Sequence, residues 1–263
     1  MKQPVFFISH GGGPWPWVEA MRVRYRATEA ALAGVVSTLP QQPKAIAIVT
    51  AHWITATFSM ATHARPGMIY DYGGFPEHTY EVQYPAPNSA EVCARLAELA
   101  SEHGLTLRAD PNHGFDHGVF VPLHVMRPQA DIPVLSLSIQ VNYDYAQHVA
   151  YGRMLAALRD EGVLLVCSGL NYHNMRGFGR AESLAPAQAF NAFLNDALTQ
   201  AAGQARIDAL AKWDHHPAAR LVHPEEDHLV PLFVAVGAAG DDPGQVLVEE
   251  MVMGIPMVSW RFG

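Results

Sequence analysis

The strongest constraint on the fold is a set of four short apolar runs that do not alternate with polar residues. The runs are Val5–Ile8, Ala45–Thr50, Val134–Ile139 and Val163–Cys167. A strand with one face in water alternates apolar and polar residues, whereas a strand covered on both faces is apolar throughout. The four runs therefore predict a mostly parallel sheet that is buried between layers of helices.

The segments between these runs have apolar residues at helical spacing. The clearest helical segments are Glu19–Gly34, Asn88–Gly104 and Asp144–Gly162. In the second of them Asn88 is the expected N-cap, and Glu91 is positioned to complete a capping box. Strands that alternate with helices along the chain indicate an α/β fold with crossover connections.

The end of the chain is expected to be helical up to Gly240 and to close with two strands, Gln245–Val252 and Pro256–Trp260. No linker, repeat or low-complexity segment divides the sequence. Hydrophobic residues make up 49% of the chain and charged residues 16%, which is the composition of a globular protein. We therefore expect one α/β domain over residues 1–263, with a central sheet flanked by helices.

Charge and cysteine usage limit the partners and the compartment. The formal net charge is −8 without a basic stripe, so no nucleic-acid partner is expected. The longest apolar stretch, Leu229–Gly240, contains Pro231 and is too short to span a bilayer, so no membrane segment is expected either. The two cysteines, Cys93 and Cys167, do not have a metal-binding spacing, and a reduced cytoplasmic setting is the expectation.

Histidine is the unusual part of the composition, with 14 copies in the chain. His10 and His52 each follow an apolar run by two residues, and His173 follows the fourth run after a short loop. Ligands of open parallel sheets bind in the crevice beyond the carboxyl ends of the strands. The three histidines are therefore predicted to converge on one site, and histidine is a common ligand of transition metals.

A further ligand is expected from the segment around His228. Pro224–Asp227 has the pattern of the first turn of an apolar helix, from which His228 could point into the crevice. Glu225, Glu226 or Asp227 could take its place, which would give the two-histidine, one-carboxylate set of non-haem Fe(II) enzymes.

Another histidine, His117, is expected at the start of a helix near the site. The neighbouring carboxylate of Asp116 is the predicted partner that sets the tautomer of the His117 ring. Two loops rich in glycine, proline and aromatic residues, Gly11–Trp17 and Tyr70–Pro87, could cover a flat ligand. The aromatic side chains expected to wall such a pocket are Trp15, Trp17, Tyr72 and Phe75.

Six segments taken together resemble a known family. They are ISHGGGPWPW, VTAHW, YDYGGFPEHTYEVQYPAP, GFDHGVFVPLHVMRPQADIPV, CSGLNYHNMR and EDHLVPLFVAVGAA. They are similar, in this order, to the consecutive motifs of the DODA-type extradiol aromatic ring-opening dioxygenases, which are relatives of the catalytic subunit of protocatechuate 4,5-dioxygenase. The resemblance runs from residue 5 to about residue 240.

The resemblance implies an α/β enzyme that uses O2 to cleave a catechol ring beside its two hydroxyls. It implies that His10, His52 and His228 are metal ligands and that His173 and His117 act on the substrate. Protocatechuate-type relatives have a carboxylate as the third ligand, where this chain has His228. Fe(II) is the expected metal, and Zn(II) is the alternative because three histidines also form catalytic zinc sites.

Two other functions stay open at this point. One is a zinc hydrolase in which the metal activates water and His173 is the acid and base. The other is a metal-binding protein without catalysis, as in the related Memo proteins. The sequence also leaves open which catechol is used and whether several copies of the chain assemble. An acidic substrate would need a cation, and Arg176 is the nearest arginine to His173 in the sequence, although it could equally be a surface residue.

Overall fold

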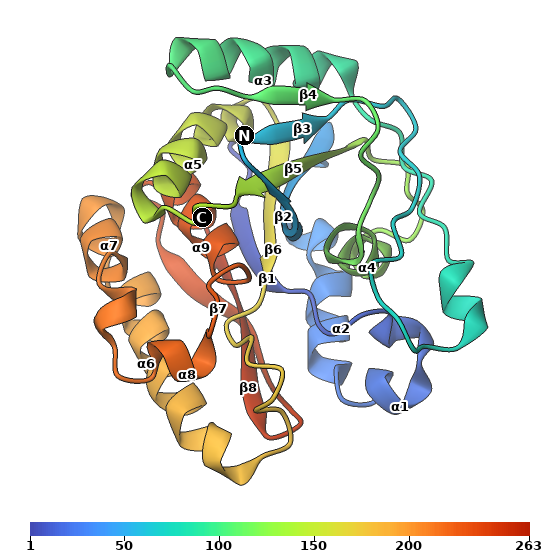
Figure 1. The fold of residues 1–263 in the computed structure, drawn as a ribbon. Coiled ribbons are helices and arrows are strands. Elements are labelled where there is room, and N and C mark those ends of the chain that lie inside the picture. The colour runs from blue at the N-terminus through green and yellow to red at the C-terminus, as the bar shows by residue number, and fades with distance from the viewer.

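The computed structural model describes residues 1–263, and its centre is a single eight-stranded sheet (Figure 1). The strand order is β4-β3-β5-β2-β6-β1-β8-β7. The four strands in the middle are parallel to one another: β1 (Val5–Ser9), β6 (Val163–Gly169), β2 (Ala45–Thr55) and β5 (Val134–Gln140). They contain the four apolar runs and are almost entirely buried, which confirms the predicted parallel core.

Antiparallel strands extend this core at both edges. The predicted C-terminal strands are present as β7 (Gly244–Val252) and β8 (Ile255–Phe262), and β8 pairs with β1. At the opposite edge lie β3 (Ser59–Ala61) and β4 (Arg108–Asp110), which were not predicted. Three residues are too few to show a periodic pattern in the sequence, so strands of this length can be recognised only from their pairing in the structure. The sheet is therefore mixed, and the predicted α/β class is confirmed.

Helices cover both faces of the sheet (Figure 1). On one face lie α5 (Tyr145–Asp160), α6 (Leu184–Thr199) and α9 (Val230–Ala239), and on the other lie α2 (Arg26–Gly34) and α4 (His117–Met126). The remaining helices are α1 (Glu19–Arg22), α3 (Ala90–Glu102), α7 (Gly203–Leu210) and α8 (Ala219–Val222). None of the helices has the length and apolar character that crossing a bilayer requires.

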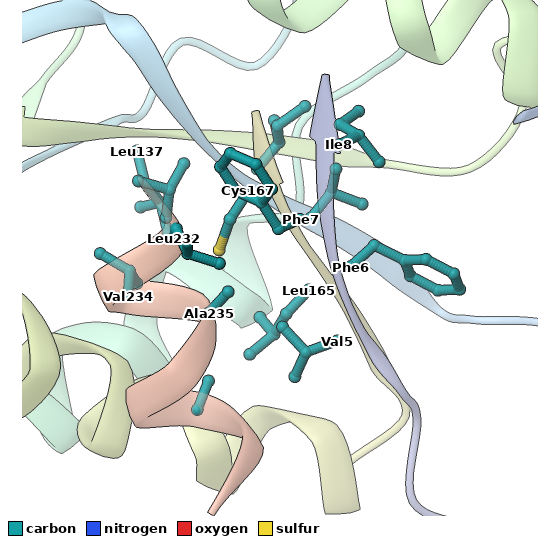
Figure 2. Packing of buried hydrophobic residues seen from close by; sticks show 14 of the residues in the cluster. Val5, Phe6, Phe7, Ile8, Leu137, Leu165, Cys167, Leu232, Val234 and Ala235 are labelled. Atoms are coloured by element: carbon teal, nitrogen blue, oxygen red, sulfur yellow. The ribbon is translucent and has the colours of Figure 1, made fainter. Parts of the chain in front are cut away.

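The core between α9 and the sheet shows why the central strands are apolar throughout (Figure 2). Leu232 and Ala235 of α9 lie over Phe7 of β1 and Cys167 of β6, while Phe6 points to the other side of the sheet. Every residue of α9 is buried. This packing holds the start of α9, and the turn before it, against the carboxyl ends of the central strands.

Three local predictions differ from the structure. The segment predicted as one helix from Glu19 to Gly34 is broken into α1 and α2, because the carboxylate of Glu250 accepts hydrogen bonds from the backbone N–H groups of Ala27 (2.8 Å) and Thr28 (3.0 Å). This distant carboxylate caps the first turn of α2.

The other two differences concern helix starts. The N-cap of α3 is Ser89, whose hydroxyl accepts from the backbone N–H of Val92, and not Asn88. Asn88 instead donates its side-chain amide to the carbonyl oxygen of Ala61. The segment 224–227 is not the first turn of a helix, because α9 begins only at Val230.

Candidate metal centre

Five imidazoles from distant parts of the chain meet at the carboxyl-terminal edge of the parallel strands. They belong to His10, His52, His117, His173 and His228. His10 directly follows β1, and His52 lies on β2 within an irregularity of its pairing with β5, between Val49 and Ile54. His117 is the first residue of α4, His173 follows β6 after a short loop, and His228 lies in the turn before α9. The structure thus brings together every histidine that the sequence singled out.

One carboxylate orients two of these rings from the loop after β3. Asp71 accepts hydrogen bonds at Oδ1 from Nδ1 (2.8 Å) and from the backbone N–H (3.0 Å) of His117, and its Oδ2 lies 3.2 Å from Nδ1 of His52. The predicted partner of His117 was Asp116, and this is wrong. Asp116 is turned toward β2, where its Oδ1 accepts from the hydroxyl of Thr50 at 2.8 Å.

A second carboxylate repeats this arrangement on the other side of the centre. Asp227 accepts from Nδ1 of His228 at Oδ2 (2.8 Å) and from Nδ1 of His173 at Oδ1 (3.2 Å). The two rings stack with their centres 3.3 Å apart. Burial by itself would raise the pKa of Asp227, but the hydrogen bonds and charges of the two imidazoles outweigh it and lower the pKa. Asp227 is therefore ionised at neutral pH.

The hydrogen bonds determine which nitrogen of each ring carries the proton. The fifth ring, that of His10, has its Nδ1 at 2.7 Å from the carbonyl oxygen of Gly11. Because ionised carboxylates and carbonyl oxygens only accept, the proton of each neutral ring is assigned to Nδ1. Every Nε2 then keeps a free lone pair, which is the form of histidine that binds metals.

Two contacts show that these lone pairs lack partners within the protein. Nε2 of His10 is buried without a hydrogen-bond partner. Nε2 of His52 lies 3.2 Å from Nε2 of His228, so that two acceptors face each other. A buried acceptor without a donor is costly, and a shared cation would relieve both contacts. The donor set therefore fits a metal ion.

Ring spacing distinguishes which histidines could share one ion. Imidazoles bound to one tetrahedral ion at about 2.0–2.1 Å place their ring centres roughly 5 Å apart. The ring centres are 5.0 Å apart for His10 and His52, 5.4 Å for His10 and His228, and 4.8 Å for His52 and His228. His117 competes with His228 for this role, because its ring centre lies 5.3 Å from that of His10 and the ligand nitrogens of His10, His52 and His117 all lie within 4.8 Å of one another. However, the ring of His117 lies only 3.9 Å from that of His52, and the ring of His173 only 3.3 Å from that of His228. The spacing favours His10, His52 and His228 as the ligands and places the other two beside them.

Burial keeps the three favoured rings neutral. Desolvation, followed by the repulsion of neighbouring histidines, lowers the pKa of His10 well below its usual value. Burial also lowers the pKa of His52 to about 4 and that of His228 to about 3. Protons therefore do not compete for these nitrogens at neutral pH, which favours metal binding.

The acidic alternatives to His228 have other partners or positions. Both oxygens of Asp227 accept from imidazoles, and Glu226 forms an ion pair with Arg220. Glu225 is exposed and lines a cleft beside His173. The geometry thus favours His228 over a carboxylate as the third ligand.

Of the four aromatic residues expected to wall a pocket, Tyr72 lies nearest the centre, with its ring 5.9 Å from that of His117. Phe75 packs on Tyr72. Trp15 is fully buried, and its indole N–H donates to the carbonyl oxygen of His10 at 2.9 Å. It therefore supports the backbone of the loop that begins at His10. Trp17 packs on His124 of α4. The expectation that the two tryptophans line the pocket is therefore wrong.

Asp71 is the residue that sequence reasoning missed at this centre. It stands in the segment YDYGGF, which was noted only for its aromatic residues. A lone aspartate in a long loop has no periodic signal, and its role appears only when the loop folds back over α4. Asp227, in contrast, was considered only as a ligand, whereas in the structure it orients two rings.

We expect Asp227→Asn to weaken metal binding about 10- to 100-fold, the usual effect of changing a residue that orients a ligand. An amide has one accepting oxygen, so it cannot accept from Nδ1 of His173 and of His228 together. Competition with a chelator would measure the affinity. The matched control is Glu226→Gln, which alters a neighbouring carboxylate that pairs with Arg220. An Asp227→Asn protein with unaltered affinity would contradict the role given to this carboxylate.

Comparison with protein families identifies a match over most of the chain. Residues 25–263 match the model of a family described as the catalytic LigB subunit of aromatic ring-opening dioxygenase. The matched range contains four of the five histidines, and His10 precedes it.

Individual relatives agree with this match. The chain is 38% identical over 231 residues to the 4,5-DOPA dioxygenase extradiol of Escherichia coli (strain K12). This alignment covers 86% of this chain and 84% of that protein. The chain is 36% identical over 248 residues to the 4,5-DOPA dioxygenase extradiol of Beta vulgaris, with coverage of 93% and 90%. The crystal structure of an uncharacterised protein from Escherichia coli K12 aligns over 100% of both chains with a TM-score of 0.80 and 32% identity.

Proposed function

The chain belongs to the family of the catalytic LigB subunit of aromatic ring-opening dioxygenases, and from this premise we propose that it is a metal-dependent extradiol dioxygenase. Its proposed substrates are O2 and a catechol, namely a 3,4-dihydroxyphenyl compound of the kind that the names of the relatives indicate. The observation that carries the proposal is the convergence of five imidazoles at one strand edge, three of them at the spacing of a shared ion.

Fe(II) is the metal that this proposal assigns to His10, His52 and His228. Three neutral ligands leave the full positive charge of the ion in place. When bound, the ion lowers the pKa of the two catechol hydroxyls and offers an open position for O2. Zn(II) could bind the same nitrogens, but it has no redox chemistry and would support hydrolysis instead.

The other two histidines are suited to move protons. His173 and His117 each have Nδ1 held by an ionised carboxylate, so Nε2 is free to accept a proton from a catechol hydroxyl. Asp227 and Asp71 would then stabilise the imidazolium that results. The protonated ring can return the proton to an oxygen atom later in the reaction. We assign the main acid–base role to His173, because its ring lines the open cleft and is more exposed than that of His117.

Extradiol cleavage is preferred over intradiol cleavage because no tyrosinate is available. Intradiol enzymes bind Fe(III) through anionic tyrosine oxygens. Tyr72 is the tyrosine whose ring lies against His117, but its hydroxyl donates to the carbonyl oxygen of Thr79 at 2.6 Å, and burial raises its pKa to about 12. The O–H group of Tyr72 is thus engaged with a backbone carbonyl oxygen, which argues against Tyr72 as an anionic ligand of the ion.

The proposal is tested by loading the protein with Fe(II) without oxygen, adding a panel of catechols, and then admitting air. We expect O2 uptake together with a yellow semialdehyde product, and no uptake with Zn(II). A colourless muconate would show intradiol cleavage and overturn the regiochemistry. If no catechol causes O2 uptake, the dioxygenase proposal fails and the zinc hydrolase becomes the better hypothesis.

A further inference from the structure

A cleft of about 400 Å³ opens beside the histidine cluster on the side of His173 and Asp227. Its size falls within the range of pockets that bind small organic molecules. Its wall also contains the side chains of Arg176 and Glu225, which come from the loop after β6 and from the turn region before α9. One positive and one negative group therefore face the same space next to the proposed proton-transfer histidine.

These two charges differ from their neighbours because they have no partner in the protein. The guanidinium of Arg176 and the carboxylate of Glu225 form no ion pair and no side-chain hydrogen bond, and both residues are exposed. Nearby, Arg180 pairs with Glu182 at 3.4 Å, and Glu226 pairs with Arg220. Asp227, the other carboxylate of the cleft, is occupied by two imidazole N–H groups. Arg176 and Glu225 are therefore the charges of the cleft that remain free for a ligand.

We propose that Arg176 and Glu225 are the specificity-determining residues that bind the side chain of the substrate, Arg176 its carboxylate and Glu225 its ammonium group. This inference rests on the proposed function, which places the catechol ring at the histidine cluster. Arginine presents its donors in a planar fork that suits a carboxylate. The free carboxylate of Glu225 would repel a substrate that carries only a negative charge, whereas an ammonium group on the same side chain would pair with it.

The test uses four catechols that differ in the charge of the side chain, of which the neutral one also has the shortest side chain. They are 3,4-dihydroxyphenylalanine (both charges), 3-(3,4-dihydroxyphenyl)propionate (negative), dopamine (positive) and 4-methylcatechol (neutral). Arg176→Gln should raise KM about 10- to 100-fold for the two carboxylate substrates, because each loses a charge-assisted hydrogen bond. Its KM for dopamine and 4-methylcatechol should stay unchanged. Glu225→Gln should raise KM for the two compounds with an ammonium group, 3,4-dihydroxyphenylalanine and dopamine. Its KM for 4-methylcatechol should stay unchanged.

Matched variants separate recognition from folding. Arg180→Gln and Glu226→Gln remove the same charges next to the cleft from residues that already have partners, and neither should change the order of preference among the four compounds. Arg176→Lys keeps the charge and should restore part of the preference for carboxylates. Calorimetry of the four compounds with the Fe(II)-loaded protein, without oxygen, gives Kd values that do not depend on turnover.

The outcomes distinguish this inference from the proposed function. If Arg176→Gln weakens the binding of all four compounds equally, or of none of them, the role of Arg176 is overturned. Ring opening by the parent protein would still stand. The same result with Glu225→Gln overturns the role of Glu225. If the parent protein opens none of the catechols but still binds the carboxylates through Arg176, the proposed chemistry fails and the recognition by Arg176 is supported.

Discussion

His228→Ala should remove tightly bound metal and abolish ring opening. The imidazole of His228 is fully buried, its Nε2 faces that of His52, and Asp227 holds its Nδ1. Changing a residue that merely orients a ligand costs about 10- to 100-fold in metal affinity, so we expect the loss of a ligand to cost at least about 100-fold. Elemental analysis of the purified protein and O2 uptake with a catechol would measure the two effects.

A control is needed because a cavity at a buried site also lowers stability. His228→Gln keeps most of the volume, and we expect it to remain folded by circular dichroism while it loses metal. His124→Gln changes a histidine that packs on Trp17 outside the cluster, and it should retain metal. If His228→Ala and His228→Gln both kept a full complement of metal, the ligand set would not include His228.

His173→Ala is expected to keep most of the metal but to lose turnover by about 10²- to 10⁴-fold, the usual contribution of a general acid or base. The ring of His173 stacks on His228, too close for both rings to surround one ion, and it lines the open cleft where a substrate would enter. Its removal leaves His228 bound to Asp227. Metal content and steady-state O2 consumption, measured on the same sample, separate binding from catalysis.

A parallel measurement on His117→Ala would assign the acid–base role between the two histidines. The larger loss of turnover at full metal content identifies the main proton acceptor, and we expect it for His173. If His173→Ala instead lost metal to the same extent as His228→Ala, His173 would be a fourth ligand. That result would leave His117, held by Asp71, as the remaining acid–base group.

The positions at which helices start and end could not be predicted from the local sequence alone. The pattern after Glu19 was compatible with one helix, but Glu250, more than two hundred residues later, supplies the carboxylate that caps α2 separately. The start of α9 was placed too early because the polar residues before it resemble a first turn. In the structure those residues instead carry Asp227 to the histidine cluster. The first error arises because a capping group can come from any part of the chain, and the second because polar residues before a helix can serve a site instead of the first turn.

The sequence by itself determined the buried parallel strands and the convergence of His10, His52 and His173. Continuous apolar runs identify strands covered on both faces, and the carboxyl ends of parallel strands necessarily share one edge of the sheet. Only the tertiary structure decided which groups orient these rings. Asp71 reaches His52 and His117 because a long loop folds over α4, and Asp227 reaches His173 because α9 packs on the sheet. Such contacts join residues that lie far apart in the sequence and that no helix or strand periodicity relates. They therefore form only when the chain packs.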